Sequence, residues 1–154
     1  MLNIGDKAPE FTLPNQDNVE ISLRDLLGKW IVLYFYPKDS TPGCTTEACD
    51  FTLALPQFEP LGAVILGVSP DSTASHQRFI AKQKLEITLL SDTNTEVAQR
   101  YGVWQLKKLY GKEYMGIVRS TFLISPEGKI AHIWSGVKVK GHAEEVKKTL
   151  EALR

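Results

Sequence analysis

Two cysteines five residues apart carry the strongest chemical signal in the sequence. Cys44 and Cys49 form a C-x4-C pattern within the segment Pro37–Cys49, which reads PKDSTPGCTTEAC. Two cysteines are too few for a disulfide scaffold, and the loop between them is too short for a crosslink to add much stability. The spacing is at the edge of a zinc half-site, but no second pair follows and the three histidines are scattered. We therefore expect thiol chemistry and no metal site.

The residues before Cys44 place it in the first turn of a helix. Pro42 suits the first helical position, where no N–H is needed, and Thr41 then becomes the N-cap. Cys44 is the third helical residue, which a capping box fills with Glu or Gln. The free N–H groups and the helix dipole there favour the thiolate, the nucleophilic form of cysteine. A small buried and inert cysteine is the plainer alternative, but the strand end and the Thr-Pro-Gly turn favour a reactive thiol.

The elements that must position this segment alternate between strand and helix. The continuous apolar run Ile31–Tyr36 predicts a strand buried on both faces. The next helix is expected from about Pro42 to Leu55, because Pro56 should stop it. We place the other strands at 11–13, 19–23, 63–68, 88–90, 121–125 and 129–134, and the other helices at 72–84, 94–101 and 144–153.

This order predicts an α/β fold with a central mixed β-sheet and helices on both faces. Ligands of such sheets bind beyond the carboxyl ends of the parallel strands, which is where the cysteine segment begins. The helix at 94–101 is expected to be capped by Thr93 or Asn94. We predict a loop or an irregular hairpin for the basic and aromatic stretch 107–116.

Length and charge limit the classes of function. The 154 residues suit one domain, 1–154. The 18 basic and 18 acidic residues cancel, so we expect neither a nucleic-acid binder nor a protein held on anionic membranes. The N-terminus lacks the pattern of a secretory signal and no apolar run is long enough to span a membrane. We therefore expect a cytoplasmic protein.

The cysteine segment resembles a known family pattern. Pro37, Thr41 and Cys44 meet the peroxiredoxin motif Pro-x-x-x-Thr-x-x-Cys, and the string Thr-Pro-Gly-Cys-Thr-x-Glu-Ala-Cys is similar to the bacterioferritin-comigratory, or Q-type, subfamily. The resemblance covers essentially the whole chain, since further similar stretches occur in the same order at 5–11, 32–37, 89–92, 101–104 and 119–124.

The resemblance implies a thioredoxin-like fold, thiol-dependent reduction of peroxides, and no metal or organic cofactor. It implies that Cys44 is the peroxidatic cysteine. Thr41 would contact the thiolate and the peroxide, and Arg119 would stabilise both. Glu47 matches a residue that helps to orient this arginine.

The resemblance also assigns the rest of the pocket and the second cysteine. Pro37 matches the proline that shields the substrate pocket, to which Pro42 and Gly43 also belong. Cys49 matches the resolving cysteine that some members carry in the same helix, and no later cysteine exists in this chain. The implied partners are a peroxide and thioredoxin or a similar dithiol reductant, and the implied state is a monomer.

Two other functions remain open at this point. A general thiol–disulfide oxidoreductase on the same fold would favour C-x-x-C, in which the second thiol is closer. A non-enzymatic redox sensor or holdase would react once with an oxidant and then need a partner to reset it.

Helix geometry makes the role of Cys49 conditional on a conformational change. Residues five apart on a helix have Cα atoms about 8.6 Å apart on nearly opposite faces, whereas a disulfide needs Cα atoms within about 7 Å. A bond between Cys44 and Cys49 therefore requires residues 42 to about 50 to unwind. The mediocre helix formers in this stretch, which include Gly43 and Thr45, make such unwinding cheap.

Overall fold

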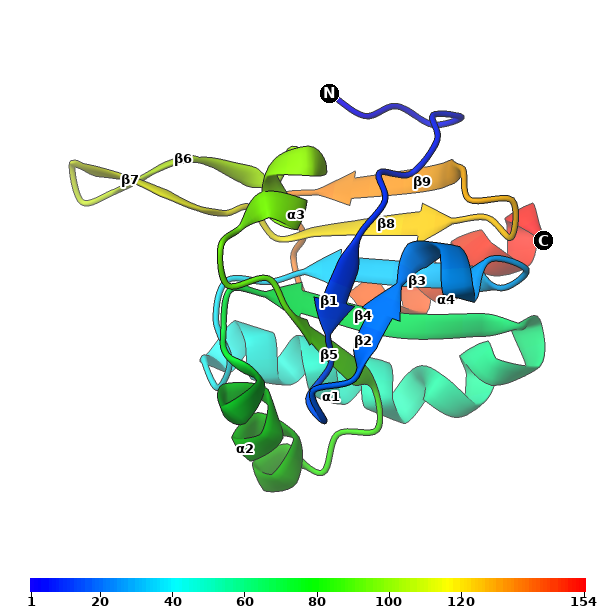
Figure 1. Ribbon diagram of the computed structural model, residues 1–154, viewed down its shortest axis with the longest axis horizontal. Coiled ribbons are helices and arrows are strands. Elements are labelled where there is room, and N and C mark those ends of the chain that lie inside the picture. The colour runs from blue at the N-terminus through cyan, green and yellow to red at the C-terminus, as the bar shows by residue number, and fades with distance from the viewer.

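The computed structural model describes all residues from 1 to 154 and has a five-stranded mixed sheet at its centre (Figure 1). In this sheet β3 (Trp30–Phe35) runs parallel to β4 (Ala63–Ser69), and β4 runs parallel to β5 (Thr88–Ser91). On the other side, β8 (Ser120–Ile124) is antiparallel to β3, and β9 (Ile130–Ser135) is antiparallel to β8. The order β5-β4-β3-β8-β9 confirms the mixed sheet.

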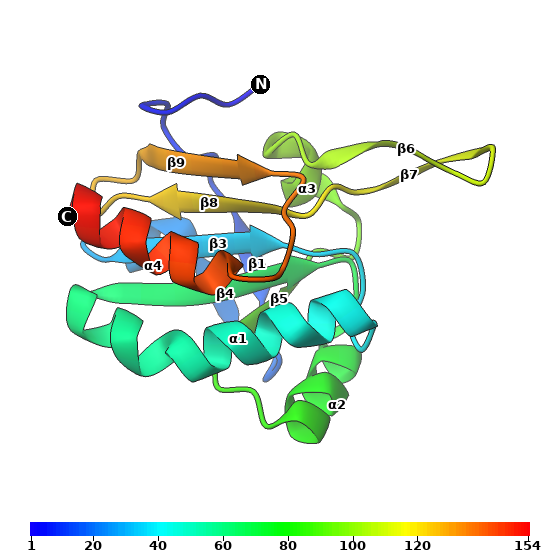
Figure 2. The same cartoon turned by 180° about the vertical axis from the view of Figure 1, so that it is seen from behind.

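Three helices cover one face of the sheet (Figure 2). These are α1 (Pro42–Phe58), α2 (Thr73–Gln83) and α4 (His142–Leu153). They pack on the side chains of alternate strand residues. Helix and strand side chains together form one continuous apolar core, which includes Val32, Tyr34, Cys44, Phe51, Phe58, Phe79, Leu89, Leu123, Val146 and Leu150. Cys44 belongs to this core, and so the packing of the helices determines where its sulfur lies.

The opposite face is covered by shorter elements. They are the two-stranded sheet of β1 (Thr12–Pro14) and β2 (Glu20–Ser22), the short 3-10 helix η1 (Leu23–Leu26) and α3 (Glu96–Arg100). The second core lies beneath them and includes Phe11, Leu33, Phe35, Leu90, Val97, Tyr101, Phe122 and Ile124. Helices on both faces of the sheet are therefore confirmed. No helix has the length and apolar character needed to cross a membrane.

The basic and aromatic stretch before β8 is more regular than we predicted. It forms a β-hairpin in which β6 (Trp104–Leu109) pairs with β7 (Lys112–Ile117) over six residues on each strand. The hairpin extends away from the body of the molecule, as Figure 1 shows. It returns to the sheet through Val118, whose N–H donates to the carbonyl of Val103, and Arg119 follows immediately.

The prediction that Pro56 ends the first long helix is wrong. The helix α1 continues to Phe58, with Pro56 inside its last turn, and the 3-10 turn η2 (Glu59–Leu61) follows. A proline so close to a helix end removes only one backbone hydrogen bond. Phe58 is fully buried in the core and holds the last turn in place, so tertiary packing outweighs the local cost.

Two helix starts also differ from the sequence prediction. The N-cap position of α3 is Thr95, not Thr93 or Asn94, although the Asn94 side chain accepts the N–H of Glu96. The buried carboxylate of Asp92 accepts the next two N–H groups, those of Val97 and Ala98. The helix α4 begins at His142, after Gly141. At α2, by contrast, the N-cap is Ser72, one of the two candidates that the sequence offers with Thr73, and its side chain accepts the N–H of Ser75.

Candidate active site

Cys44 lies in the first turn of α1, as predicted, at the end of the segment that leaves β3. Thr41 is the extended N-cap residue and Pro42 is the first helical residue. The side chain of Cys44 is almost completely buried, with 1% exposure, and its thiol is free. The fold therefore holds an unpaired sulfur at a helix N-terminus, where the exposed backbone N–H groups and the helix dipole favour negative charge.

The guanidinium of Arg119 joins this sulfur to a buried carboxylate. Its Nη2 donates to Cys44 Sγ at 3.3 Å, and its Nη1 donates to Glu47 Oε1 at 2.6 Å. Burial alone would lower the pKa of Arg119, but the charges of Glu47 and Cys44 raise it above the ordinary value. The guanidinium therefore stays positively charged beside the sulfur, which stabilises the thiolate.

Gly43 allows Arg119 to approach this closely. A Cβ at position 43 would lie 3.1 Å from Arg119 Nη2, tighter than an ordinary van der Waals contact. A larger residue would force the guanidinium to shift by a few tenths of an ångström. Gly43 thus belongs to the site through its lack of a side chain.

Glu47 is an unusual carboxylate because it is almost fully buried and only half paired. Its exposure is 1%, and Oε2 has no hydrogen-bond partner, while Oε1 accepts from Arg119. Burial raises the pKa of Glu47 to about 7 against the opposing effect of Arg119. Near neutral pH this group therefore exchanges a proton, and the charge beside Arg119 changes with it.

Thr41 occupies the predicted cap position but does not cap the helix with its side chain. Its hydroxyl donates to the carbonyl of Lys38 at 2.8 Å, and no N–H of α1 donates to it. The hydroxyl proton is thus used within the loop, and the oxygen lone pairs stay available to a ligand. Pro37 is half-buried at the end of β3, and Pro42 is exposed at the helix start.

Cys49 lies on the same intact helix as Cys44, and both thiols are free. Its side chain is half-buried, and its sulfur faces Oε1 of Gln83 on α2 at 3.9 Å. Burial, followed by the charge of Asp50, raises the pKa of Cys49. In this conformation Cys49 is therefore a protonated and weakly nucleophilic thiol.

Two buried polar side chains near the site were not singled out from the sequence. The hydroxyl of Tyr34 is buried without a partner, and its ring stacks on Phe51 of α1. His142 accepts or donates a hydrogen bond at 2.8 Å with Thr121 of β8, two residues after Arg119. Burial lowers the pKa of His142 to about 4, Glu145 opposes this, and Arg119 adds to it. A tyrosine in an apolar strand and a histidine at a helix start carry no local signal for these positions.

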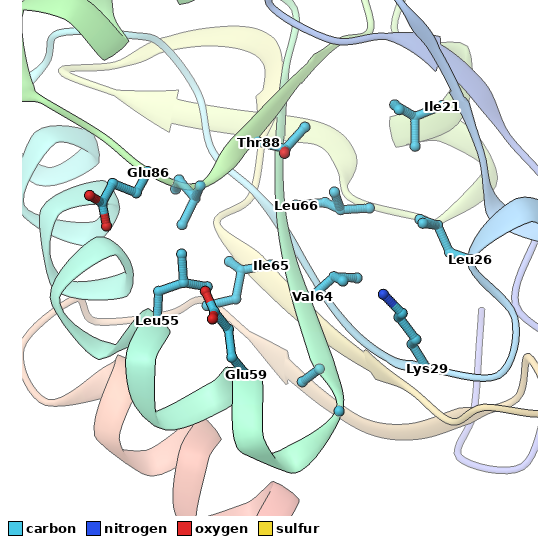
Figure 3. A pocket seen from close by; sticks show the side chains of 13 residues that line it. Ile21, Leu26, Lys29, Leu55, Glu59, Val64, Ile65, Leu66, Glu86 and Thr88 are labelled. Atoms are coloured by element: carbon cyan, nitrogen blue, oxygen red, sulfur yellow. The ribbon is translucent and has the colours of Figure 1, made fainter.

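The thiol does not line the apolar hollow on the surface near the far end of α1. That hollow, of about 580 Å³, is lined by apolar side chains such as Leu55, Val64 and Leu66, with Lys29 and Glu59 among its polar members (Figure 3). Leu55 is eleven residues after Cys44 on α1, a distance of roughly 16 Å along the helix. Chemistry at Cys44 therefore takes place away from this hollow.

A thioredoxin-like fold with a buried thiol beneath a guanidinium defines a class of thiol peroxidases, and the comparisons with known proteins agree. The AhpC/TSA family model matches residues 4–133. The chain belongs to this family and, within it, to the Q-type peroxiredoxins, also called bacterioferritin-comigratory proteins. It is accordingly an enzyme that reduces peroxides with a thiol.

The curated relatives match over almost the full length of the chain. A protein of Bacillus subtilis named peroxiredoxin Bcp is 52% identical over 150 residues, which are 97% of this chain and 96% of the relative. A Helicobacter pylori protein named putative peroxiredoxin bcp is 51% identical over 149 residues, covering 97% and 98% of the two chains.

Solved structures show the same fold. A peroxiredoxin Q mutant of Xylella fastidiosa has a TM-score of 0.94 at 44% identity and covers 99% of this chain and 97% of its own. The Xanthomonas campestris bacterioferritin comigratory protein, studied for alkyl peroxide reduction, has a TM-score of 0.89 at 48% identity and covers 92% and 90%.

The raised pKa of the buried Glu47 carboxylate predicts how the stability of the fold depends on pH. Because the pKa of Glu47 is raised from 4.5 to about 7 by folding, the folded state holds this proton more tightly. Stability is therefore lost as pH rises through that window. We expect the free energy of unfolding of Glu47→Gln, relative to the wild type, to rise by about 1–3 kcal/mol between pH 4.5 and pH 8. Urea denaturation measures it.

The exposed Glu127→Gln variant is the matched control and should show no such trend. His142 makes its contribution in the opposite direction, since its lowered pKa removes stability as pH falls towards 4. That contribution is common to the wild type and the variant and cancels in their difference. A difference that stays constant across the pH range would show that Glu47 titrates as an ordinary surface carboxylate.

Proposed function

We propose that Cys44 is the nucleophile of this peroxidase and that Arg119 is its principal electrostatic partner. The observation that carries the proposal is the 3.3 Å contact from Arg119 Nη2 to Cys44 Sγ at the start of α1. A sulfur with a fixed cation on one side and a helix N-terminus on the other is stabilised as the thiolate. The same cation is in place for the negative charge that develops on the departing oxygen.

The first step transfers one oxygen atom to the sulfur. The Cys44 thiolate attacks the terminal oxygen of the hydroperoxide, the O–O bond breaks, and the other oxygen leaves as hydroxide or alkoxide. Cys44 becomes a sulfenic acid, the first reversible level of cysteine oxidation, and the leaving oxygen takes up a proton to give water or an alcohol. Glu47, which exchanges a proton near pH 7, holds the guanidinium in place for this step.

Thr41, Pro37, Pro42 and Gly43 complete the proposed pocket. The lone pairs of the Thr41 hydroxyl can accept a hydrogen bond from the peroxide, because the hydroxyl proton is already given to Lys38. Gly43 keeps the approach to Arg119 open. The two prolines bound the pocket on the side of the loop and of the helix start.

Cys49 is the proposed resolving cysteine. Its thiol attacks the Cys44 sulfenic acid, which forms a disulfide and releases water, and a dithiol reductant then restores both thiols by exchange. Both cysteines lie in α1, which is intact, and its geometry keeps them too far apart to bond. The first turns of α1 must therefore unwind once in each cycle and re-form after reduction.

We also propose the setting in which the enzyme works. Its substrates are hydrogen peroxide and organic hydroperoxides, in keeping with the alkyl peroxide reduction studied in the Xanthomonas relative. Thioredoxin or a similar dithiol protein is the reductant, and a cytoplasmic location would supply it. Residues 1–154 act as one domain and as a monomer, since both cysteines belong to one helix of one chain.

A coupled assay tests the proposed function. Loss of NADPH is followed in the presence of thioredoxin, thioredoxin reductase and a hydroperoxide, and we expect Cys44→Ser to abolish it. Cys49→Ser should be oxidised once by peroxide but should not turn over with thioredoxin. Full turnover of Cys44→Ser would contradict the assignment. Reduction of an insulin disulfide without peroxide consumption would instead identify a general thiol–disulfide oxidoreductase.

Substitution of Arg119 should lower the oxidation rate of Cys44 far more than it lowers the stability of the fold. Removal of one donor to a developing oxyanion typically costs about 10²–10³ in rate, and we expect this loss for Arg119→Ala in stopped-flow oxidation of Cys44. Arg119→Lys should recover only part of the rate, because a point charge cannot hold both Glu47 and the sulfur. A thermal melt checks that the variants fold. Wild-type oxidation rates in Arg119→Ala would remove the arginine from the mechanism.

Hydrogen exchange tests the unwinding of α1. We expect the amides from Thr45 to Phe51 to lose protection in the oxidised protein, while the amides of β3 and β8 keep theirs. Equal protection in both redox states would refute the unwinding. Mass spectrometry provides the second readout, since a Cys44 found joined only to external thiols would make this a one-cysteine enzyme.

A further inference from the structure

A second buried carboxylate lies behind the active-site loop and belongs to Asp39. Its side chain is 3% exposed and accepts hydrogen bonds from the hydroxyl of Tyr36 at 2.5 Å, the hydroxyl of Ser75 at 2.8 Å and Nδ1 of His76 at 2.7 Å. Burial raises the pKa of Tyr36, with further contributions from Tyr34 and Asp39, so the Tyr36 hydroxyl keeps the proton that it donates. A carboxylate with three donors is well stabilised away from water.

His76 faces acceptors at both of its ring nitrogens. Nδ1 faces the Asp39 carboxylate, and Nε2 lies 3.1 Å from the carbonyl of Leu90. The Tyr36 hydroxyl, 3.5 Å from Nδ1, donates instead to Asp39. Because a carboxylate and a carbonyl are both hydrogen-bond acceptors, this arrangement suits a ring that carries a proton on each nitrogen. Its side chain is fully buried, so the geometry points to a buried ion pair between His76 and Asp39.

This pair connects the active-site loop to three other elements. Tyr36 and Asp39 lie on the loop after β3, and His76 lies on α2 and reaches the carbonyl of Leu90 on β5. The backbone N–H of Asp39 also donates to Asp71 Oδ2 at 2.8 Å, and the same oxygen accepts from Ser69 at the end of β4. The loop is thereby fixed by Ser75 and His76 of α2 and by Asp71 after β4, while the Leu90 carbonyl of β5 holds His76 from its other side.

The start of α1 has fewer polar contacts with other elements than the loop before it. Its first turn has the backbone bond from Thr45 N–H to the Thr41 carbonyl, the bond from the Thr46 hydroxyl to the Pro42 carbonyl, and the contacts of Arg119. Ser40 lies between the two parts with a φ of 63°, which a non-glycine residue adopts at a cost. The hydrogen bonds that tie the loop to Asp71 and α2 therefore end at Asp39, just before Ser40.

We propose that Asp39 and His76 are a positioning pair that anchors the loop 37–41 while α1 unwinds and re-forms. The anchor keeps Thr41 and the start of α1 at the position from which Cys44 meets Arg119 after every cycle. Neither residue contacts the sulfur, so their effect on the reaction passes through the loop. This inference takes only the unwinding of α1 from the proposed cycle. The positioning of Cys44 for its oxidation does not depend on that cycle.

Spectroscopy and exchange on the wild type test the anchor without any variant. In ¹⁵N-labelled protein we expect both ring nitrogens of His76 to be protonated in the reduced and in the oxidised form. The amide of Asp39 should stay protected in both forms, whereas the amides from Thr45 to Phe51 lose protection on oxidation. A neutral His76 ring, or an Asp39 amide that exchanges freely in the disulfide form, would overturn the proposal.

Kinetics separate positioning from a loss of stability. We expect Asp39→Asn and His76→Gln to slow the oxidation of Cys44 by at least tenfold in stopped-flow fluorescence, and to change the later rate of disulfide formation by less than threefold. The double variant should lose less than the sum of the single losses, because it leaves no unpaired buried charge. Ser22→Ala, which removes a hydroxyl bond to Thr12 on the other face, controls for general destabilisation and should oxidise at the wild-type rate.

The outcomes distinguish this proposal from the proposed function. Oxidation of folded Asp39→Asn and His76→Gln at the wild-type rate would refute the positioning role, even if Cys44 and Cys49 form their disulfide. Absence of that disulfide in the wild type would refute the role of Cys49 and leave the oxidation rates as the test of the anchor. If the variants fail to fold, the wild-type spectroscopy and exchange decide.

Discussion

The contact between Arg119 and Cys44 is the interaction on which the site depends. One guanidinium donates to the sulfur at 3.3 Å and to Glu47 at 2.6 Å, so the residue just before β8 fixes the first turn of a helix far from it in sequence. Gly43 favours this contact because a Cβ there would lie only 3.1 Å from Arg119 Nη2, and the guanidinium would have to shift. The charge that stabilises the thiolate is therefore also a structural link between the sheet and α1.

Glu47 shows the energetic cost of this arrangement. A carboxylate that is 1% exposed with one unpartnered oxygen is unfavourable as an anion, and burial raises its pKa to about 7. Protonation relieves that cost but weakens the attraction to Arg119. The position of the guanidinium over Cys44 is thus coupled to proton exchange at a neighbouring residue, which suits a reaction that must deliver a proton to a leaving oxygen.

Stability is distributed unevenly along the chain around the thiol. The loop before α1 is fixed by a buried ionic cluster centred on Asp39, while the first turn of α1 contains Gly43 and threonines with little intrinsic helix preference. The far end of the helix is held by Phe58 in the core. This distribution favours local unfolding of the segment that would have to change shape for the proposed bond between Cys44 and Cys49.

The local sequence was sufficient for the position of Cys44 and for most of the sheet. Neighbouring residues are enough to predict a buried strand, a proline at the first helical position and a thiol in the first turn. The resemblance to the Q-type peroxiredoxins pointed to Arg119 and Glu47. The sequence was wrong about the end of α1, because Phe58 packing outweighs the local effect of Pro56. It could not show the side chains that join distant elements, such as His76 with Asp39 and His142 with Thr121. Local preferences act over a few residues, whereas burial, pairing and pKa shifts arise only when folding brings remote side chains together away from water.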